Sequence, residues 1–226
     1  MRWNSKKEGM KVSKGEIFEH VFINEPEVDL HIVQEAGSRV KIHVINVPKA
    51  PNDSNDPKDF RNSITIEQTG EGCQTEIYAL AYLHNDERVT TETHVKHAVG
   101  GGCSNQLVKF VLDDESRGRF IGDLKIAKDA QQTEAHQTNR NLLLSETAEM
   151  RTQPQLEIYA DDVKASHGAS TGQLDESALF YMQQRGIDKQ KARQLLVGAF
   201  MREIIEKIQD SVIREQLLNT IDGVVE

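Results

Sequence analysis

The sequence predicts a mainly β protein that ends in a small helical region. Through most of the 226 residues, short stretches of alternating apolar and polar residues recur at intervals of about 10 to 15 residues, as in half-buried strands. The tight hairpin dipeptides Asn-Gly and Asp-Gly are absent between these stretches. Many short strands without tight hairpins fit a β-solenoid. They also fit a sandwich with longer loops, because no clean fixed-length repeat separates the two.

The strands are predicted from the phase of their apolar residues. Signals are weak over the first 27 residues or so. Residues that share one phase of a stretch are Val40, Ile42 and Val44; Ile64 and Ile66; Phe120, Leu124 and Ile126; and Leu156 and Ile158. The segment "TEIYALAYL" (75–83) is apolar in both phases, which indicates a strand covered on both faces. Residues 48–59 hold three of the five prolines with Asn, Asp and Ser, so they are predicted to form a surface loop.

A slip in apolar phase marks a bend near the end of the predicted β region. Ile158 and Ala160 share one phase, whereas Val163 and Ala165 take the other. From about residue 175 helix signals replace strand signals. Asp175 is a good N-cap and Gly186 a stop signal for a first helix. Asp188 can cap a second helix over 189–209, and a third runs from about 211 to 221.

The second predicted helix carries apolar residues on two opposite sides. One stripe consists of Ala192, Leu195, Leu196 and Ala199, and the other of Val197, Met201, Ile204, Ile205, Ile208 and Val212. A surface helix needs only one apolar stripe to pack on its own core. The second stripe is covered either by neighbouring helices or by another protein, and the sequence leaves both readings open.

Composition limits the classes of partner. The net charge of −9 disfavours nucleic acid, since phosphate binding needs a basic field. No apolar run approaches the roughly 18 residues of a membrane span, and no apolar segment of a signal peptide follows the charged start. With only two cysteines, we expect a reducing, cytoplasmic location. Cys73 and Cys103 are interpreted as small core residues, with a metal or cluster role as the alternative.

Few residues offer chemistry. His94 and His97 lie near Cys103, but residues three apart in a strand point to opposite faces and cannot share a metal without a turn. The run "GGGC" (100–103) is followed by no phosphate-binding signature and is predicted to be a turn. No complete catalytic motif is present. His167, between the predicted strands and helices, remains as a turn histidine or as a group that binds metal or moves protons.

The segment from Arg140 to Phe200 resembles the SufB/SufD family of iron–sulfur cluster assembly scaffolds. The resemblance rests on "QPQLEIYADDVKASHGAS" (153–170) and "LDESALFY" (174–181) followed by "RGI" (185–187), and it covers about 135 to 210. Gly168 in "SHGAS" is typical of the SufD branch, because SufB members carry Glu there. The resemblance implies a right-handed parallel β-helix over 1–174 and a small C-terminal α-helical domain over 175–226.

The resemblance also implies partners. A SufD-like chain pairs with a SufB-like scaffold through the β-helices, and its helical domain binds a SufC-like ABC-type ATPase. It is no enzyme itself, because the energy comes from the ATPase. The implied docking residues are Leu179, Phe180, Tyr181, Val197, Phe200, Met201 and Ile204. A nascent iron–sulfur cluster forms transiently at the complex interface, with His167 as a nitrogen ligand, and no cofactor is bound by this chain alone.

Two departures from the family pattern matter. Many members carry Cys where this chain has Ala165, so no thiolate is available there. Members are commonly about twice as long, so the chain is expected to be a fragment that lacks the N-terminal part.

Two alternative functions remain open. One alternative is a divergent β-solenoid protein-binding module outside the Suf system. Another is an enzyme that uses His167 with Asp161, Asp162 and Asp175. A homodimer is expected when the partner is absent.

Overall fold

The computed structural model describes residues 9–47 and 58–224, so most of the loop expected at 48–59 lies outside the described residues. The strands are β1 (Met10–Val12), β2 (Ile17–Ile23), β3 (Glu27–Gln34), β4 (Arg39–Asn46), β5 (Asp59–Gln68), β6 (Gln74–Leu83), β7 (Arg88–His97), β8 (Cys103–Leu112), β9 (Arg117–Ile126), β10 (Thr133–Leu143), β11 (Glu149–Ile158) and β12 (Val163–Gly172). The helices are α1 (Glu176–Gln184), α2 (Lys189–Ile205) and α3 (Ser211–Val224). Strands β1 and β2 fall in the region where the sequence signals are weak.

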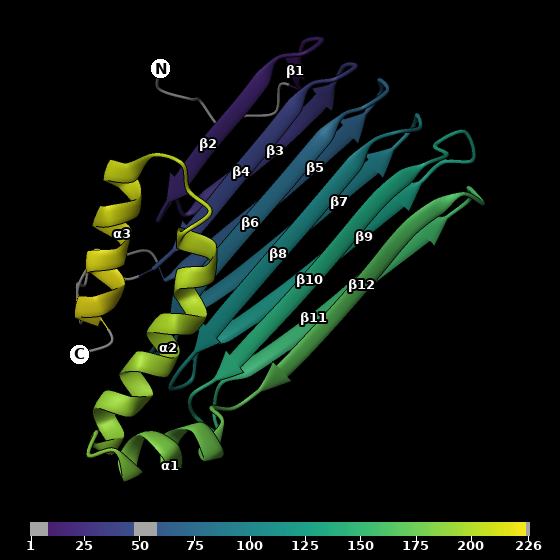
Figure 1. The fold of residues 1–226 in the computed structure, drawn as a ribbon. Helices are drawn as coiled ribbons and strands as arrows, with labels where there is room; N and C mark the ends of the chain where they lie inside the picture. The colour runs from purple at the N-terminus through teal and green to yellow at the C-terminus, as the bar shows by residue number, and fades with distance from the viewer. Residues whose placement is uncertain (1–8, 48–57, 225–226) are drawn as a thin grey trace.

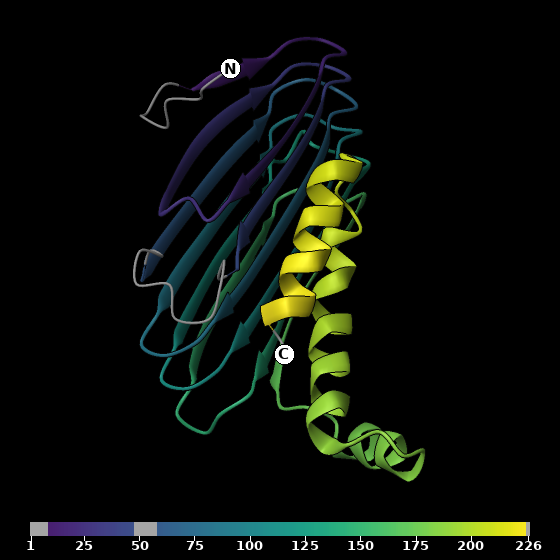
Figure 2. The same cartoon turned by 90° about the vertical axis from the view of Figure 1, so that its left-hand side faces the viewer.

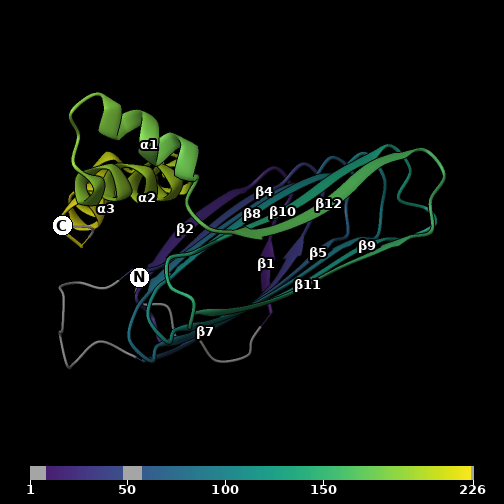
Figure 3. The same ribbon diagram turned by 90° about the horizontal axis from the view of Figure 1, so that it is seen from below.

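The strands form a parallel β-solenoid of about five turns, which confirms the solenoid and excludes the sandwich. Each coil gives one strand to each of two facing sheets (Figures 1 and 3). The odd sheet has the order β1-β3-β5-β7-β9-β11, and the even sheet has the order β2-β4-β6-β8-β10-β12. Each strand pairs only with the equivalent strand of the coil before and after it, so β11 and β12 are the edges at one end.

The solenoid interior is built from the predicted apolar phases. The Val40, Ile42 and Val44 side chains of β4 are buried between the sheets, as are Ile64 and Ile66 of β5. In β9, Phe120, Leu124 and Ile126 are likewise buried. The phase slip after Ile158 is the corner between β11 and β12. Because residues at equivalent positions stack in register from coil to coil, each inward position forms a column along the solenoid.

Residues with a left-handed backbone mark the corners and explain why no fixed repeat is visible. Gly15, Gly37, Gly72, Gly101 and Gln132 have positive φ at the successive turns from the odd sheet to the even sheet. These positions are unevenly spaced along the chain, because the corners differ in length and the first four strands are shorter than the later ones. "GGGC" is one of these turns, as predicted.

Helices α2 and α3 pack on the outer face of the even sheet, over the later parts of its strands, and form a second core with it (Figure 2). Tyr78 and Leu80 point outward from β6 and pack against Val197, Met201 and Ile204 of α2. This explains the two apolar phases of 75–83. Asp175 and Asp188 cap α1 and α2 as predicted. Helix α2 ends at Ile205 rather than near 209, because Asp210 already accepts hydrogen bonds from the first amides of α3.

Candidate functional site

The last coil of the solenoid carries the main sequence-predicted site residue. Strand β12 pairs with β10 over ten residues, and it has no strand on its other side among the described residues. The edge strand β11 of the odd sheet is open in the same way. Ile158 and Tyr159, at the corner between the two strands, are exposed. This end therefore offers unpaired backbone groups beside apolar side chains, a combination that favours pairing with another chain.

His167 lies on the inward face of β12. Its register partner on β10 is the buried Gln137, and the column continues through Gln106, Ile77 and Ile42. His167 itself is exposed, since no further coil of the described chain covers it. Among the described residues its ring forms no hydrogen bond or ion pair. The interpretation of His167 as a turn histidine is wrong, because the residue lies within the last strand, paired in register with β10.

Nearby groups do not make a metal site with His167. The described residues contain no group of three or more His, Cys, Asp or Glu side chains that could hold a metal ion. Ala165 also faces inward and is half-buried. On the outward face of β12, the Ser166 hydroxyl contacts Nδ1 of His136 at 2.8 Å. Asp161, Asp162 and Asp175, named above for an enzyme alternative, lie at the corners that flank the strand.

The first helix keeps two of the predicted docking residues at the surface. Phe180 is 63% exposed and Tyr181 is 57% exposed, with the Arg185 guanidinium 4.4 Å from the Tyr181 ring centroid. Leu179 is instead buried on the inner side of α1. Helix α1 packs on α2 and projects beyond the solenoid (Figures 2 and 3). The two exposed aromatic rings are therefore available to a partner.

The expectation that Val197, Met201 and Ile204 form a docking face is wrong for the chain as described. These side chains are buried against the even sheet, as Leu179 is buried within the helices. The sheet can accept them because the outward side chains beneath α2 include the apolar Tyr78, Leu80 and Val111. Leu195 and Ala199, on the opposite stripe of α2, are exposed instead. Phe200 is half-buried and lies at the border of this contact.

A buried lysine fixes the middle of α2 on the even sheet. The Nζ atom of Lys109 donates to the carbonyl oxygen of Phe200 at 2.8 Å and bonds the Glu203 carboxylate. Arg140 Nη1 also reaches Glu203, at 3.3 Å. Burial lowers the pKa of the Lys109 ammonium, while the hydrogen bond from Lys109 lowers the pKa of Glu203. Lys109 is not among the residues predicted above, although a single Lys in the apolar run "LVKFVL" (107–112) could have indicated it.

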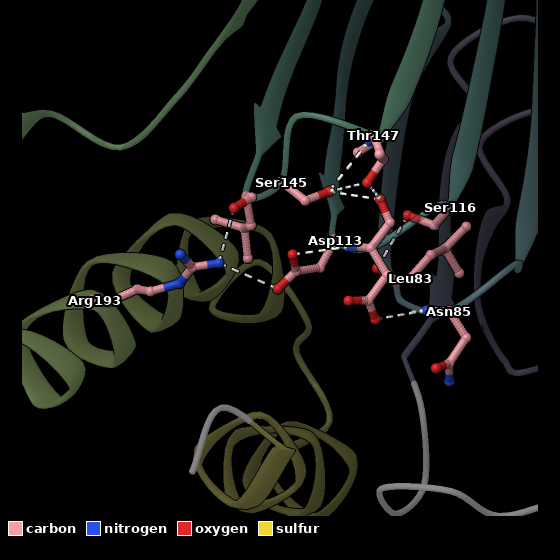
Figure 4. A network of polar contacts seen from close by, with 10 residues as sticks. Leu83, Asn85, Asp113, Ser116, Ser145, Thr147 and Arg193 are labelled. Carbon is pink, nitrogen blue, oxygen red and sulfur yellow. Dashed lines mark hydrogen bonds and ion pairs between the residues drawn. The ribbon is translucent and has the colours of Figure 1, made fainter.

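Polar contacts attach the start of α2 to the solenoid corners (Figure 4). Arg193 Nη2 lies 3.2 Å from Asp113 Oδ2 and donates to the Leu144 carbonyl at 3.0 Å. Beside it, the hydroxyls of Ser145 and Thr147 both donate to the Asp114 carbonyl at 2.6 Å. The position of the helices therefore depends on corner residues of neighbouring coils.

The other candidate residues have structural surroundings. His97 is buried and its Nε2 lies 2.8 Å from Ser104 Oγ, whereas His94 faces outward and pairs with Asp123 at 2.8 Å. The two histidines point to opposite faces, as predicted. Burial lowers the pKa of His97 to about 4. Cys73 is buried as expected.

The core interpretation of Cys103 is wrong. It begins β8 on the outward phase of the even sheet, where it is exposed and lines a groove with Gln74, Glu76 and Glu134. Its register neighbours are Gln74 and Glu134. No helix among the described residues is long and apolar enough to cross a membrane.

Comparison with known proteins identifies the family. Residues 28–200 match the family model for the SufBD core domain of SUF-system FeS cluster assembly. The chain is 39% identical over 162 residues to the iron–sulfur cluster assembly protein SufD of Escherichia coli K12, an alignment that covers 72% of this chain and 38% of the relative. Identity to the chloroplastic protein ABCI7 of Arabidopsis thaliana is 36% over 166 residues, covering 73% and 35%.

A third relative is more distant. The iron–sulfur cluster assembly protein SufD of Bacillus subtilis 168 is 31% identical over 154 residues, covering 68% of this chain and 32% of the relative. The chain thus spans between 32% and 38% of the length of these three relatives. Since the family model covers most of the chain, and the most similar relatives include SufD proteins, the chain belongs to the SufB/SufD family of the Suf iron–sulfur cluster assembly system and is most like SufD.

Proposed function

We propose that the chain is a SufD-like scaffold subunit that pairs with a SufB-like scaffold and binds a SufC-like ABC ATPase. In this role it is not catalytic. It holds two partners, and the nascent iron–sulfur cluster is the cargo assembled between them. We further propose a cytoplasmic location in the source organism, which the two free cysteines support.

The observation that carries the proposal is the open last coil with an inward histidine. The edges of β11 and β12 present unpaired backbone groups, and strand addition at such an edge is a common mode of protein recognition. His167 lies beside this edge on an uncovered coil. A partner coil placed against β12 would therefore cover His167, so that the histidine would lie at the interface.

The imidazole of His167 suits a nascent cluster as a nitrogen ligand. Histidine replaces cysteine on the iron of some iron–sulfur clusters, and the ring here has no competing hydrogen bond among the described residues. Ala165 supplies no thiolate on the same face. In this proposal the remaining ligands come from the partner, and the chain alone holds no cluster.

The proposed ATPase contact is the exposed aromatic pair on α1. Phe180 and Tyr181 lie side by side in the sequence on a helix that projects from the solenoid. Aromatic residues of this kind are enriched in protein interfaces. Leu195 on α2 adds an exposed apolar group of the same helical region.

The test is co-expression of the chain with the SufB-like scaffold and SufC-like ATPase of the same organism. We expect a complex of all three proteins in size-exclusion chromatography with light scattering. The His167→Ala variant should form the same complex but hold less cluster by visible absorbance and iron content. His94→Ala, on the outer face of the odd sheet, is the matched control.

Each result addresses one part of the proposal. A folded wild-type chain that binds neither partner would contradict the scaffold role. Equal cluster yield in His167→Ala and wild type, within an intact complex, would contradict the ligand role and leave the scaffold role in place.

A further inference from the structure

The interior of the solenoid changes from apolar to polar toward the last coil. On the even sheet, one inward column reads Ile42, Ile77, Gln106, Gln137 and His167. On the odd sheet, the column Leu30, Ile64, Thr93, Gly122 and Pro154 loses its large apolar side chains over the same coils. Buried amides need partners, so this replacement of isoleucine by glutamine calls for an explanation.

The amide of Gln137 is oriented by its neighbour in the preceding coil. Its Nε2 donates to Oε1 of Gln106 at 3.4 Å, a long hydrogen bond between two side chains that are fully buried. The Oε1 atom of Gln137 is buried and has no partner. Because the oxygen and nitrogen of a primary amide point in different directions, the oxygen does not share the contact with Gln106 and is free to accept another hydrogen bond.

Gly122 on the opposite wall makes room for this amide. A Cβ atom at position 122 would lie 2.4 Å from Nε2 and 2.7 Å from Oε1 of Gln137. Real Cβ atoms do not approach other atoms so closely, so any larger residue would displace the amide. The side chain of Gln137 thus crosses the interior and rests on the backbone of β9.

His167 is the next residue of the column beyond Gln137. Neighbouring strands of a sheet lie about 4.8 Å apart, so side chains on the same face of two paired residues are within hydrogen-bonding reach. On the opposite wall, Pro154 follows Gly122 in register and offers no side-chain hydrogen bond. Gln137 is therefore the polar neighbour of His167 within the column.

We propose that Gln137 is a positioning residue for His167: the exposed ring, which forms no hydrogen bond among the described residues, rotates so that its N–H on the β10 side donates to the unpartnered Oε1 of Gln137. The ring nitrogen on the other side is then unprotonated, and its lone pair is directed to the open end of the solenoid. Metal-bound histidines commonly donate their second ring N–H to an oxygen in this way, which fixes the tautomer and the ring orientation. The inference rests on the proposed role of His167 as a ligand.

The test reads the tautomer of His167 directly in the 226-residue chain, without partners or cluster. Long-range ¹H–¹⁵N correlation spectra of histidine-labelled protein are recorded at a pH where the ring is neutral, and His167→Ala assigns the signal. We expect one dominant tautomer in the wild type. Gln137→Met, which removes the acceptor at nearly constant shape, should shift both ring ¹⁵N signals toward the averaged values of a mixed population.

Two further variants separate the loss of positioning of the His167 ring from a general loosening of the solenoid interior. Gln137→Glu keeps an acceptor oxygen and should retain the wild-type tautomer. Gln68→Met removes another buried glutamine, in an earlier coil, and should leave the His167 signals unchanged. Three results would each overturn the proposal: mixed tautomers in the wild type, unchanged His167 signals in Gln137→Met, or an equal shift of these signals in Gln68→Met. If a variant fails to fold, the wild-type spectrum alone still tests the proposal.

The result is independent of cluster assembly. If His167→Ala leaves the cluster yield unchanged, the ligand role fails while a hydrogen bond between His167 and Gln137 can still be present. If the tautomer is mixed, the positioning inference fails while the ligand role remains open to the cluster assay.

Discussion

The outer face of the even sheet and the last coil both start from the same parallel strands, but only the first is completed within the chain. Apolar outward side chains of β6 and β8, such as Leu80 and Val111, lie beneath α2, and the Lys109 ammonium among them is paired with Glu203. The last coil instead leaves two strand edges, His167 and nearby apolar side chains uncovered. The covered face supplies stability, and the uncovered coil is suited to association. Substitutions should therefore affect unfolding on one surface and assembly on the other.

The largest expected effect is on the covered face. Ile204→Ala should lower the free energy of unfolding by about 3 kcal/mol, because a fully buried side chain leaves a cavity between α2 and the even sheet. Leu195→Ala, on the exposed stripe of the same helix, should cost less than about 1 kcal/mol. Urea unfolding followed by circular dichroism measures both. Equal losses would show that the helix is not anchored by its inner stripe.

Acid should weaken the same surface. His43 is buried on the outward side of β4, stacked on Tyr78, and burial, with Lys41 nearby, lowers its pKa to about 4. The unfolded chain has a histidine pKa of about 6.5, so it binds more protons between these two values. Stability is therefore fully present above about pH 6.5 and falls as the pH drops toward 4, by roughly 2 to 3 kcal/mol for this group.

The pH effect is separated from that of the carboxylates by comparison with a variant. His43→Leu should flatten the dependence of the urea midpoint between about pH 6.5 and pH 4 relative to wild type. His97, buried inside the solenoid with a pKa of about 4, makes a second contribution of the same sign that remains in this variant. Parallel curves for wild type and His43→Leu would refute the assignment.

Two ion pairs, one on the covered face and one on an exposed face, allow a second comparison of stability. Glu203→Ala should cost about 2 kcal/mol, because the buried Lys109 ammonium loses its charged acceptor. Glu157→Ala removes the partner of Lys125 on the outer face of the odd sheet, where both side chains are about half exposed. That loss should stay within about 0.5 kcal/mol. Thermal or urea unfolding of the two variants in parallel gives the difference, and equal costs would contradict it.

Substitutions of the exposed aromatic residues of α1 should have the smallest effect on stability. Their effect on association should be large. The double variant Phe180→Glu and Tyr181→Glu should change the free energy of unfolding by less than about 0.5 kcal/mol. It should abolish co-purification with the SufC-like ATPase, because charged groups replace the aromatic contact. Val212→Glu, an equally exposed apolar site on α3, is the control. Retained binding in the double variant would rule out α1 as the dock.

Local patterns in the sequence predicted much of the fold. Inward phases such as Ile64 and Ile66, and the caps Asp175 and Asp188, depend only on near neighbours along the chain. The solenoid itself could not be chosen over a sandwich, because corners of unequal length hide the repeat. The family resemblance supplied that choice, and the match over residues 28–200 agrees with it.

The site was less accessible to prediction because it depends on contacts between distant segments. The helical periodicity of α2 shows two apolar stripes, but only the docked structure shows that Val197 and Met201 face the sheet. Cys103 occupies an outward position that its apolar character does not reveal. Gln137 and His167 are separated by a whole coil in sequence, and they become neighbours only through strand register.

Helix α2 also affects the order in which the coils of the solenoid unfold. A solenoid whose coils touch only their neighbours can unravel from an end one coil at a time. The contacts of α2 and α3 reach side chains of β4, β6, β8 and β10, so these coils are bound into one cooperative block. The coil of β11 and β12 lies outside this block, because the contacts named above do not reach it. The backbone amides of this coil should therefore exchange hydrogen with solvent faster than those of the block. A partner that adds a coil there would cover the end coil on both sides and slow its exchange.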